Sequence, residues 1–207
     1  MPTAQYGVTL QVGTVTTQKS IIVTGDHENS FVIALPAGKA VTAWVKTDAN
    51  TAACNLPSGH GYTAGNFDVY WATGVRYGVA GTITTNAIAL DGGAGDDFPA
   101  SGELNMVVCK QVTISGSIDG DAVQIIGITA EYANTNSTAR AHLDMQDGAA
   151  ASIEALTLTA NTPQVWHVAA GATNVFTGNV IEALYASNGS ATEAAILKIP
   201  NLETATA

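Results

Sequence analysis

The sequence predicts an all-β protein, an antiparallel β-sandwich of jelly-roll type, from three observations. Hydrophobic and polar residues alternate with a period of two in many segments, which is typical of strands with one buried face. Turn sequences rich in Gly, Asn and Asp separate these segments at intervals of about ten residues, a spacing typical of sandwiches and barrels. Hydrophobic residues make up 46% of the 207 positions, enough to form a core without metals or disulfides.

The expected strands follow one another along the whole chain. Alternation is clearest at 8–12 and 139–146, and in the second segment we expect His142 and the other polar residues to face solvent. Further strands are expected at 20–24, 31–35, 41–46, 67–72, 106–114, 121–129, 153–159, 164–169 and 195–199. The segments 149–156 and 180–186 are the helical candidates, each long enough for two turns, and both are shorter than helices that are stable on their own.

The chain divides most naturally at residues 98–103, where small and turn-forming residues separate two strand-rich halves. We therefore expect an N-terminal β domain at 1–100 and a C-terminal β domain at 104–207. A single large sandwich is the alternative, because 207 residues suit either one large β domain or two domains of about 100 residues each.

Charge is scarce and mostly negative. Charged residues make up 12% of the chain, and the net charge is −10. Arg140 is the only Lys or Arg between Lys110 and Lys198, so the chain lacks the basic stripe that binds nucleic acid or an anionic membrane. Its uncharged polar residues favour packing between subunits, because burying them avoids the desolvation of charges. We therefore expect a homo-oligomer, with a trimer favoured, that binds neither nucleic acid nor membrane.

The start of the chain and its cysteines indicate synthesis in the cytoplasm. Residues 1–6 lack the basic and apolar regions of a secretion signal. The longest apolar stretch, 122–130, is too short to span a bilayer. The two cysteines, Cys54 and Cys109, are therefore expected to be reduced and buried.

No motif predicts catalysis or a bound cofactor. The sequence has no G-x-S-x-G turn and no C-x-x-C pair, and its four histidines match no zinc pattern. The loop with Asp91, Asp96 and Asp97 has the hard oxygen ligands that Ca²⁺ prefers, but it matches no EF-hand. We expect an exposed hairpin tip there, with a Ca²⁺ site as the weaker alternative, and we expect that the protein is not an enzyme.

Two tyrosines are candidate ligand-binding aromatics. By alternation, Phe67 and Trp71 lie on one face of a strand and Tyr70 lies on the other, with Tyr77 nearby. Because exposed aromatic rings stack on sugars, Tyr70 and Tyr77 predict a lectin-like site as one alternative. We expect Phe67 and Trp71 to lie in the core, since aromatics at a period of two usually pack between sheets.

The whole chain resembles the virion structural proteins of tailed bacteriophages, above all capsid decoration or cement proteins. The resemblance rests on the scarcity of Lys and Arg, on strands rich in Ala, Thr, Gly and Asn, and on the tail at 201–207. The segment 67–97 also resembles uncharacterised phage products. The resemblance implies an oligomeric β protein without catalysis that binds other virion proteins, such as the major capsid protein.

The function that this resemblance implies is that of an auxiliary head protein that stabilises the capsid shell. A location on the outer capsid surface or in the tail agrees with the acidic charge, because packaged DNA repels a chain of net charge −10. A tail or fibre component and a carbohydrate-binding β-sandwich module are the alternatives.

Overall fold

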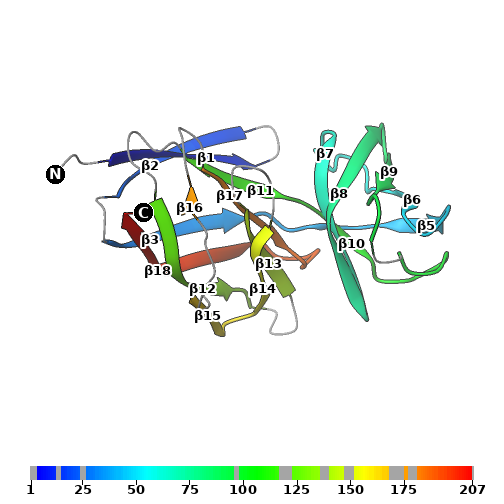
Figure 1. Ribbon diagram of the computed structural model, residues 1–207. Coiled ribbons are helices and arrows are strands. Elements are labelled where there is room, and N and C mark those ends of the chain that lie inside the picture. The colour runs from blue at the N-terminus through cyan, green and yellow to red at the C-terminus, as the bar shows by residue number, and fades with distance from the viewer. Residues whose placement is uncertain are drawn as a thin grey trace.

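The protein is an all-β molecule built from three antiparallel sheets (Figure 1). The computed structural model describes residues 4–12, 15–23, 27–95, 98–116, 123–135, 140–146, 152–167, 175–176 and 181–206. None of the described residues is helical, and they therefore include no helix of the length and hydrophobicity needed to cross a membrane. The predicted fold class, an antiparallel β-sandwich, is confirmed.

Two of the sheets form the body of the molecule. The first has the order β14-β13-β17-β11-β1-β2 and consists of β1 (Ala4–Val12), β2 (Val15–Val23), β11 (Val112–Gly116), β13 (Arg140–Gln146), β14 (Ser152–Thr159) and β17 (Ile181–Asn188). The second has the order β15-β12-β18-β3, and β16 pairs with β12 off this path. Its strands are β3 (His27–Leu35), β12 (Val123–Ala133), β15 (Pro163–His167), β16 (Val175–Phe176) and β18 (Ala195–Thr206). Both sheets contribute buried side chains to the core of the body, among them Ile33, Leu35, Ile128, Tyr132, Leu143, Leu158 and Leu197.

The third sheet forms a lobe that is inserted between β3 and β11. It has the order β4-β10-β7-β8-β9-β6-β5. Its strands are β4 (Lys39–Ala40), β5 (Thr42–Lys46), β6 (Thr51–Asn55), β7 (Gly65–Trp71), β8 (Gly74–Thr84), β9 (Ala87–Asp91) and β10 (Val107–Lys110). We call residues 38–111 the inserted lobe and the rest of the chain the body. Figure 1 shows the lobe at one end of the molecule.

The inserted lobe has an apolar core of its own. Its strands β6 and β9 alternate between buried and more exposed positions, as strands with one buried face do. Trp44 and Phe98 meet edge to face with ring centroids 5.4 Å apart, and Trp44 Nε1 donates a hydrogen bond to the carbonyl of Pro99. The other buried members of this core are Ala52, Cys54, Leu56, Phe67, Val69, Val79, Ile88, Leu90, Met106 and Val108. The prediction that Phe67 lies in a core is therefore confirmed, and Trp71 packs against that core while partly exposed.

The described residues of both helical candidates form strands. β14 covers 152–159 and β17 covers 181–188. Near the end of β14, Leu158 is buried while Thr157 and Thr159 are exposed, which is the period of a strand. β17 lies between β13 and β11, and pairing on both sides outweighs the helix propensity of its alanines.

Sheet membership does not follow the predicted division at 98–103. β3 from the first half of the chain pairs with β18 from the second half, and β10 from the second half pairs with β7 from the first. The segment 98–103 connects β9 with β10 inside the inserted lobe. A division into units at 1–100 and 104–207 that fold independently stays a prediction.

Candidate functional site at the junction of lobe and body

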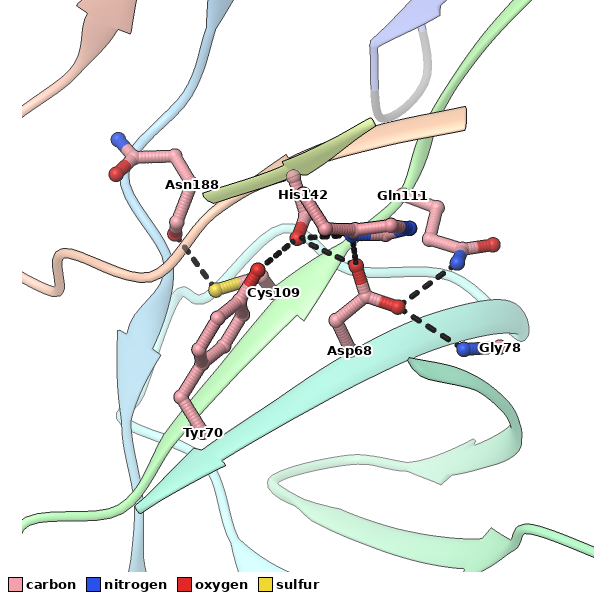
Figure 2. Close-up of polar contacts among 8 residues, drawn as sticks. Asp68, Tyr70, Gly78, Cys109, Gln111, His142 and Asn188 are labelled. Carbon is pink, nitrogen blue, oxygen red and sulfur yellow. Dashed lines mark hydrogen bonds and ion pairs between the residues drawn. The ribbon is translucent and has the colours of Figure 1, made fainter. Parts of the chain in front are cut away.

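Strand β7 is buried on both faces, and one of these faces meets the body. Phe67 points into the core of the inserted lobe, whereas Asp68 and Tyr70 lie on the opposite face. Asp68 has no exposed surface, and Tyr70 is 4% exposed. Figure 2 shows both side chains directed toward the body, with Asp68 next to His142 of β13. The Tyr70 hydroxyl contacts Ser187 of β17.

The Asp68 carboxylate has polar partners from both parts of the molecule. Its Oδ1 accepts hydrogen bonds from the backbone N–H of Gly78 at 3.0 Å and from Gln111 Nε2 at 2.8 Å, both in the lobe. Its Oδ2 accepts a hydrogen bond from Ser187 Oγ at 2.5 Å and lies 2.5 Å from His142 Nδ1, both in the body. A buried carboxylate requires partners for its lone pairs, so Asp68 couples lobe and body through directional bonds.

Further polar contacts extend this network. The Tyr70 hydroxyl lies 2.7 Å from Ser187 Oγ, and Cys109 Sγ donates to the carbonyl of Asn188 at 2.7 Å. Burial raises the pKa of the Tyr70 hydroxyl and of the Cys109 thiol well above their usual values, and the negative charge of Asp68 raises both further. Both groups therefore stay protonated at neutral pH. In this form the Tyr70 hydroxyl and the Cys109 thiol can each donate a hydrogen bond across the junction.

Asp68, His142 and Ser187 are the residue types of a nucleophilic triad, but their arrangement differs from one. In a triad the histidine binds the acid with one ring nitrogen and the serine with the other. Here the same nitrogen, His142 Nδ1, faces both Asp68 Oδ2 and Ser187 Oγ, the latter at 3.4 Å. His142 and Ser187 are each 1% exposed, so neither offers surface to a substrate. The geometry is that of a network that holds two parts together.

A groove of about 460 Å³ opens beside this network. Its lining residues are Tyr70, Trp71, Ala72, Asn105 and Val107 of the lobe and Arg140, Gly189, Ser190, Ala191 and Thr192 of the body. Arg140 Nη2 donates hydrogen bonds to the carbonyls of Trp71 and Gly74, at 2.9 and 3.0 Å. The guanidinium therefore fixes the turn between β7 and β8 against the body and forms part of the groove wall.

The two tyrosines predicted as ligand-binding aromatics both lie at the junction. Tyr70 is buried, and its ring meets that of Tyr77 edge to face with centroids 6.3 Å apart. Tyr77 is half-buried and stacks on His142 with centroids 4.0 Å apart, and burial raises the pKa of its hydroxyl. Packing thus covers Tyr70 and one face of Tyr77, and the aromatic with partly exposed surface at the groove is Trp71.

The Ca²⁺ alternative rests on the loop with Asp91, Asp96 and Asp97. Asp91 is exposed, and its Oδ1 accepts a hydrogen bond from the N–H of Gly93 at 2.9 Å. Arg76 Nη2 donates to the carbonyl of Gly93 at 2.8 Å, so a cationic side chain already holds this loop. Asp96 and Asp97 lie outside the described residues, and within the described part of the chain no group of three metal-ligand side chains occurs. The Ca²⁺ alternative stays a prediction.

Sequence reasoning missed the roles of Asp68, Arg140, His142 and Ser187. The prediction that His142 faces solvent is wrong, because the inserted lobe covers that face of β13. The available signal was Asp68, a carboxylate that shares its strand face with Tyr70 in an otherwise apolar strand. A local pattern does not predict which distant strand lies beside such a carboxylate. The hydrogen-bond partners of Asp68 could therefore not be predicted from the sequence.

Comparison with protein-family models, with curated proteins and with solved structures finds no match for this chain. Its function is therefore inferred from the residues described above.

Proposed function

We propose that this chain is a non-enzymatic structural subunit of a tailed-phage virion, a capsid decoration or auxiliary head protein that stabilises the shell. The observation that carries the proposal is the outward face of the β15-β12-β18-β3 sheet, which combines exposed apolar side chains with the ion pair of Lys198 and Glu131. Such a face supports assembly through contact between sheets. The complete burial of Asp68, His142 and Ser187 supports a structural role for the polar network.

Three large hydrophobic side chains are exposed on this face. Val165, Ile196 and Val32 expose 56%, 43% and 51% of their surface. In the sheet register, Ile196 pairs with Ala34 on one side and with Ala133 on the other, so small apolar residues surround it. Removing apolar surface from water contributes about 25 cal/mol per Å², which favours covering this face with another protein surface.

One ion pair lies on this face, close to Ile196. Lys198 Nζ is 3.2 Å from Glu131 Oε1, and Lys198 pairs with Val32 in the sheet register. The part of the face around Ile196 and Val32 therefore carries little net charge, although the chain as a whole carries −10. A second copy can approach it without the repulsion that an acidic surface imposes, which favours this chain itself as the partner. The oligomer we propose is closed, and a trimer is the favoured state.

In the virion, we place this oligomer on the outer capsid surface, where it bridges copies of the major capsid protein. The acidic charge supports an outer position, because the chain and packaged DNA repel each other. A tail or fibre component is the second placement, since the same uncharged contacts would serve a tail assembly.

The first experiment measures the mass of the full chain in solution by light scattering after size exclusion. We expect a closed oligomer for the unchanged chain and a folded monomer for the double variant Val165→Glu/Ile196→Glu. The matched control, Val45→Glu/Leu104→Glu, changes residues in the inserted lobe that are 52% and 74% exposed, and it should remain oligomeric. A monomer at every concentration, or a Val165→Glu/Ile196→Glu variant of unchanged mass, contradicts the proposed interface.

The second experiment tests the place in the virion. Antibodies against the chain are used for immunogold labelling of particles from the phage whose genome encodes it. Labelling over the head is the expected result, and labelling over the tail selects the second placement. Particles that contain none of the chain by mass spectrometry would overturn the virion proposal, whatever its oligomeric state.

A further inference from the structure

The groove at the junction has the size and position of a small-ligand site. Its volume of about 460 Å³ lies within the range of about 300–1,000 Å³ that is typical of ligand pockets. Both the inserted lobe and the body contribute to its walls, and ligand sites occur preferentially where two parts of a protein meet. The groove lies beside the buried network of Asp68, so the positions of its two walls are fixed relative to each other.

The charged side chain in the lining of the groove is a cation, although the chain is acidic. Arg140 is the only charged side chain among the described residues that line it, whereas the chain carries a net charge of −10. Its Nη2 is held by the carbonyls of Trp71 and Gly74 at 2.9 and 3.0 Å, so a ligand would find the guanidinium already ordered. A planar guanidinium matches the geometry of a carboxylate, so the groove favours a ligand that carries one.

Trp71 provides a flat apolar wall. Its indole lies so close to Gly74 that a Cβ atom at that position would be 2.5 Å from the ring. Glycine therefore lets the ring lie against the turn between β7 and β8, which holds the ring in place. An indole combines a broad apolar face with one polar N–H, and such a face packs against the C–H groups of a sugar ring.

Amide and hydroxyl groups complete the lining. Asn105 is exposed and has a φ of 58°, a conformation that asparagine tolerates better than most residues. The Ser190 N–H donates to Asn188 Oδ1 at 3.0 Å, and the Ser190 carbonyl accepts from the N–H of Gly38 at 2.8 Å. The segment that carries Ser190 and Thr192 is therefore tied to both parts of the molecule. Polar groups fixed in this way select a ligand with several hydroxyls.

We propose that this groove binds a saccharide that carries a carboxylate. Arg140 faces the carboxylate, Trp71 packs against the sugar ring, and Asn105 and Thr192 bind its hydroxyls. The groove and the outward face around Ile196 share no residue, so the saccharide site and the proposed assembly can fail independently.

The test uses the full chain and five soluble probes, with binding followed by tryptophan fluorescence and calorimetry. The acidic sugars are glucuronic acid and N-acetylneuraminic acid, the neutral sugars are glucose and N-acetylglucosamine, and propionate is a carboxylate without a ring. At least one acidic sugar should bind about 10- to 100-fold more tightly than the neutral sugars, the range expected for a hydrogen bond to a charged group. Propionate should also bind more weakly than that sugar. The absence of saturable binding by both acidic sugars, or equal binding of acidic and neutral sugars, overturns the proposal, and so does equal binding of propionate.

Two variants place the binding in the groove. Asn105→Gly removes the amide but keeps a residue that accepts a positive φ, and it should weaken binding about three- to tenfold. Thr85→Gly is the matched control, because Thr85 has a φ of 49° and does not line the groove. Ala72→Trp fills the groove from an exposed position and should abolish binding while the melting temperature is unchanged. Binding that survives Ala72→Trp, or that Asn105→Gly and Thr85→Gly affect equally, contradicts the proposed site.

Discussion

The core of the inserted lobe and its junction with the body are equally buried but chemically opposite. The lobe core consists of apolar side chains such as Phe67 and Leu90, which are 0% and 2% exposed. The junction, one residue further along the same strand, contains Asp68 with His142 and Ser187, none of which is more than 1% exposed. Strand β7 thus contributes to both environments through its two faces.

This difference separates two structural tasks. Apolar burial is non-directional, so the lobe core stabilises the lobe without fixing its orientation on the body. Hydrogen bonds are directional, and the Asp68 contacts with His142 and Ser187 at 2.5 Å hold the lobe at one position. We therefore expect substitutions in the core to destabilise the lobe, and substitutions in the junction to uncouple the lobe from the body.

The largest expected effect is that of Asp68→Ala. The substitution removes the common acceptor of Gly78, Gln111 and Ser187 and leaves His142 without its carboxylate. Each buried donor left without an acceptor costs about 1–3 kcal/mol, so we expect the free energy of unfolding to fall by about 4 kcal/mol, measured by urea unfolding followed by circular dichroism. We also expect the single unfolding transition to separate into two, one for the lobe and one for the body.

The control for this substitution is Asp48→Ala in the same lobe. Asp48 is exposed and accepts hydrogen bonds from the backbone N–H groups of Asn50 and Thr51, which lower the pKa of its carboxyl. Because this carboxyl is in solvent, the control should shift the unfolding midpoint only slightly at neutral pH. Equal effects of Asp68→Ala and Asp48→Ala would mean that the junction network contributes no more than a surface turn.

The second largest effect is that of Leu90→Ala in the lobe core. Truncating a buried leucine removes apolar contacts and leaves a cavity, which costs about 3 kcal/mol. The loss should appear in the unfolding of the lobe while the contacts of Asp68 persist, so the position of the lobe on the body is unchanged. Leu104→Ala is the control, because Leu104 is 74% exposed. Its truncation should not change the urea concentration at the midpoint of unfolding. A split transition in Leu90→Ala would contradict the separation of tasks.

The same comparison explains what the sequence predicted and what it did not. The lobe core was predictable where local alternation decides burial, as in the placement of Phe67. Strand β8 was missed because Gly78 and Gly81 interrupt its pattern, although Gly81 is required where a Cβ atom would lie 2.5 Å from the Phe67 ring. The segment of β17 was a helical candidate because its alanines favour helices, whereas its two neighbouring strands decide its structure.

The junction could not be predicted, because its partners are far apart in the sequence. Ser187 lies 119 positions from Asp68, and no periodicity connects them. His142 follows a regular alternation that predicts a solvated face. The side chain is buried because the inserted lobe packs against this face of β13. Local patterns thus determine strands and their core faces, and the order of strands in the sheets determines which polar groups meet.

The third prediction concerns the two thiols at alkaline pH. Burial raises the pKa of Cys54 in the lobe core to about 12, and burial together with the charge of Asp68 raises that of Cys109 at the junction. Because the folded state raises both pKa values, their contribution to stability is complete below the ordinary thiol pKa near 9 and is lost as the pH rises through the folded values. Urea unfolding between neutral pH and a pH of about 10.5 should therefore show decreasing stability.

Asp68→Asn distinguishes the two thiols, because it removes the charge that acts on Cys109 and leaves Cys54 in its apolar surroundings. We expect a smaller alkaline loss of stability in Cys54→Ala and in Cys109→Ala than in the unchanged chain. The charge of Asp68 also raises the pKa of Tyr70, an effect that both backgrounds share. Asp68→Asn should therefore reduce the remaining loss of stability more in Cys54→Ala than in Cys109→Ala. The same effect of Asp68→Asn in both backgrounds would show that the two thiols have equivalent surroundings.

The smallest expected effect is that of Tyr70→Phe, which removes only the hydroxyl that lies 2.7 Å from Ser187 Oγ. A hydrogen bond of this kind contributes about 1 kcal/mol to the free energy of unfolding. The loss should not exceed this value, because Ser187 retains its bond to Asp68 in the variant. Tyr62→Phe in the lobe is the matched control, since the Tyr62 hydroxyl donates to the carbonyl of Val108 at 3.0 Å.

A double-mutant cycle then separates a network from a sum of contacts. If the junction acts as one unit, Tyr70→Phe should have a different effect on the free energy of unfolding in the Asp68→Asn background, by about 0.5 kcal/mol or more. Tyr62→Phe has no contact with Asp68 and should have the same effect in both backgrounds. Additivity of both tyrosine substitutions would mean that the junction is held by independent bonds, and the contrast with the lobe core would then be one of chemistry and not of cooperativity.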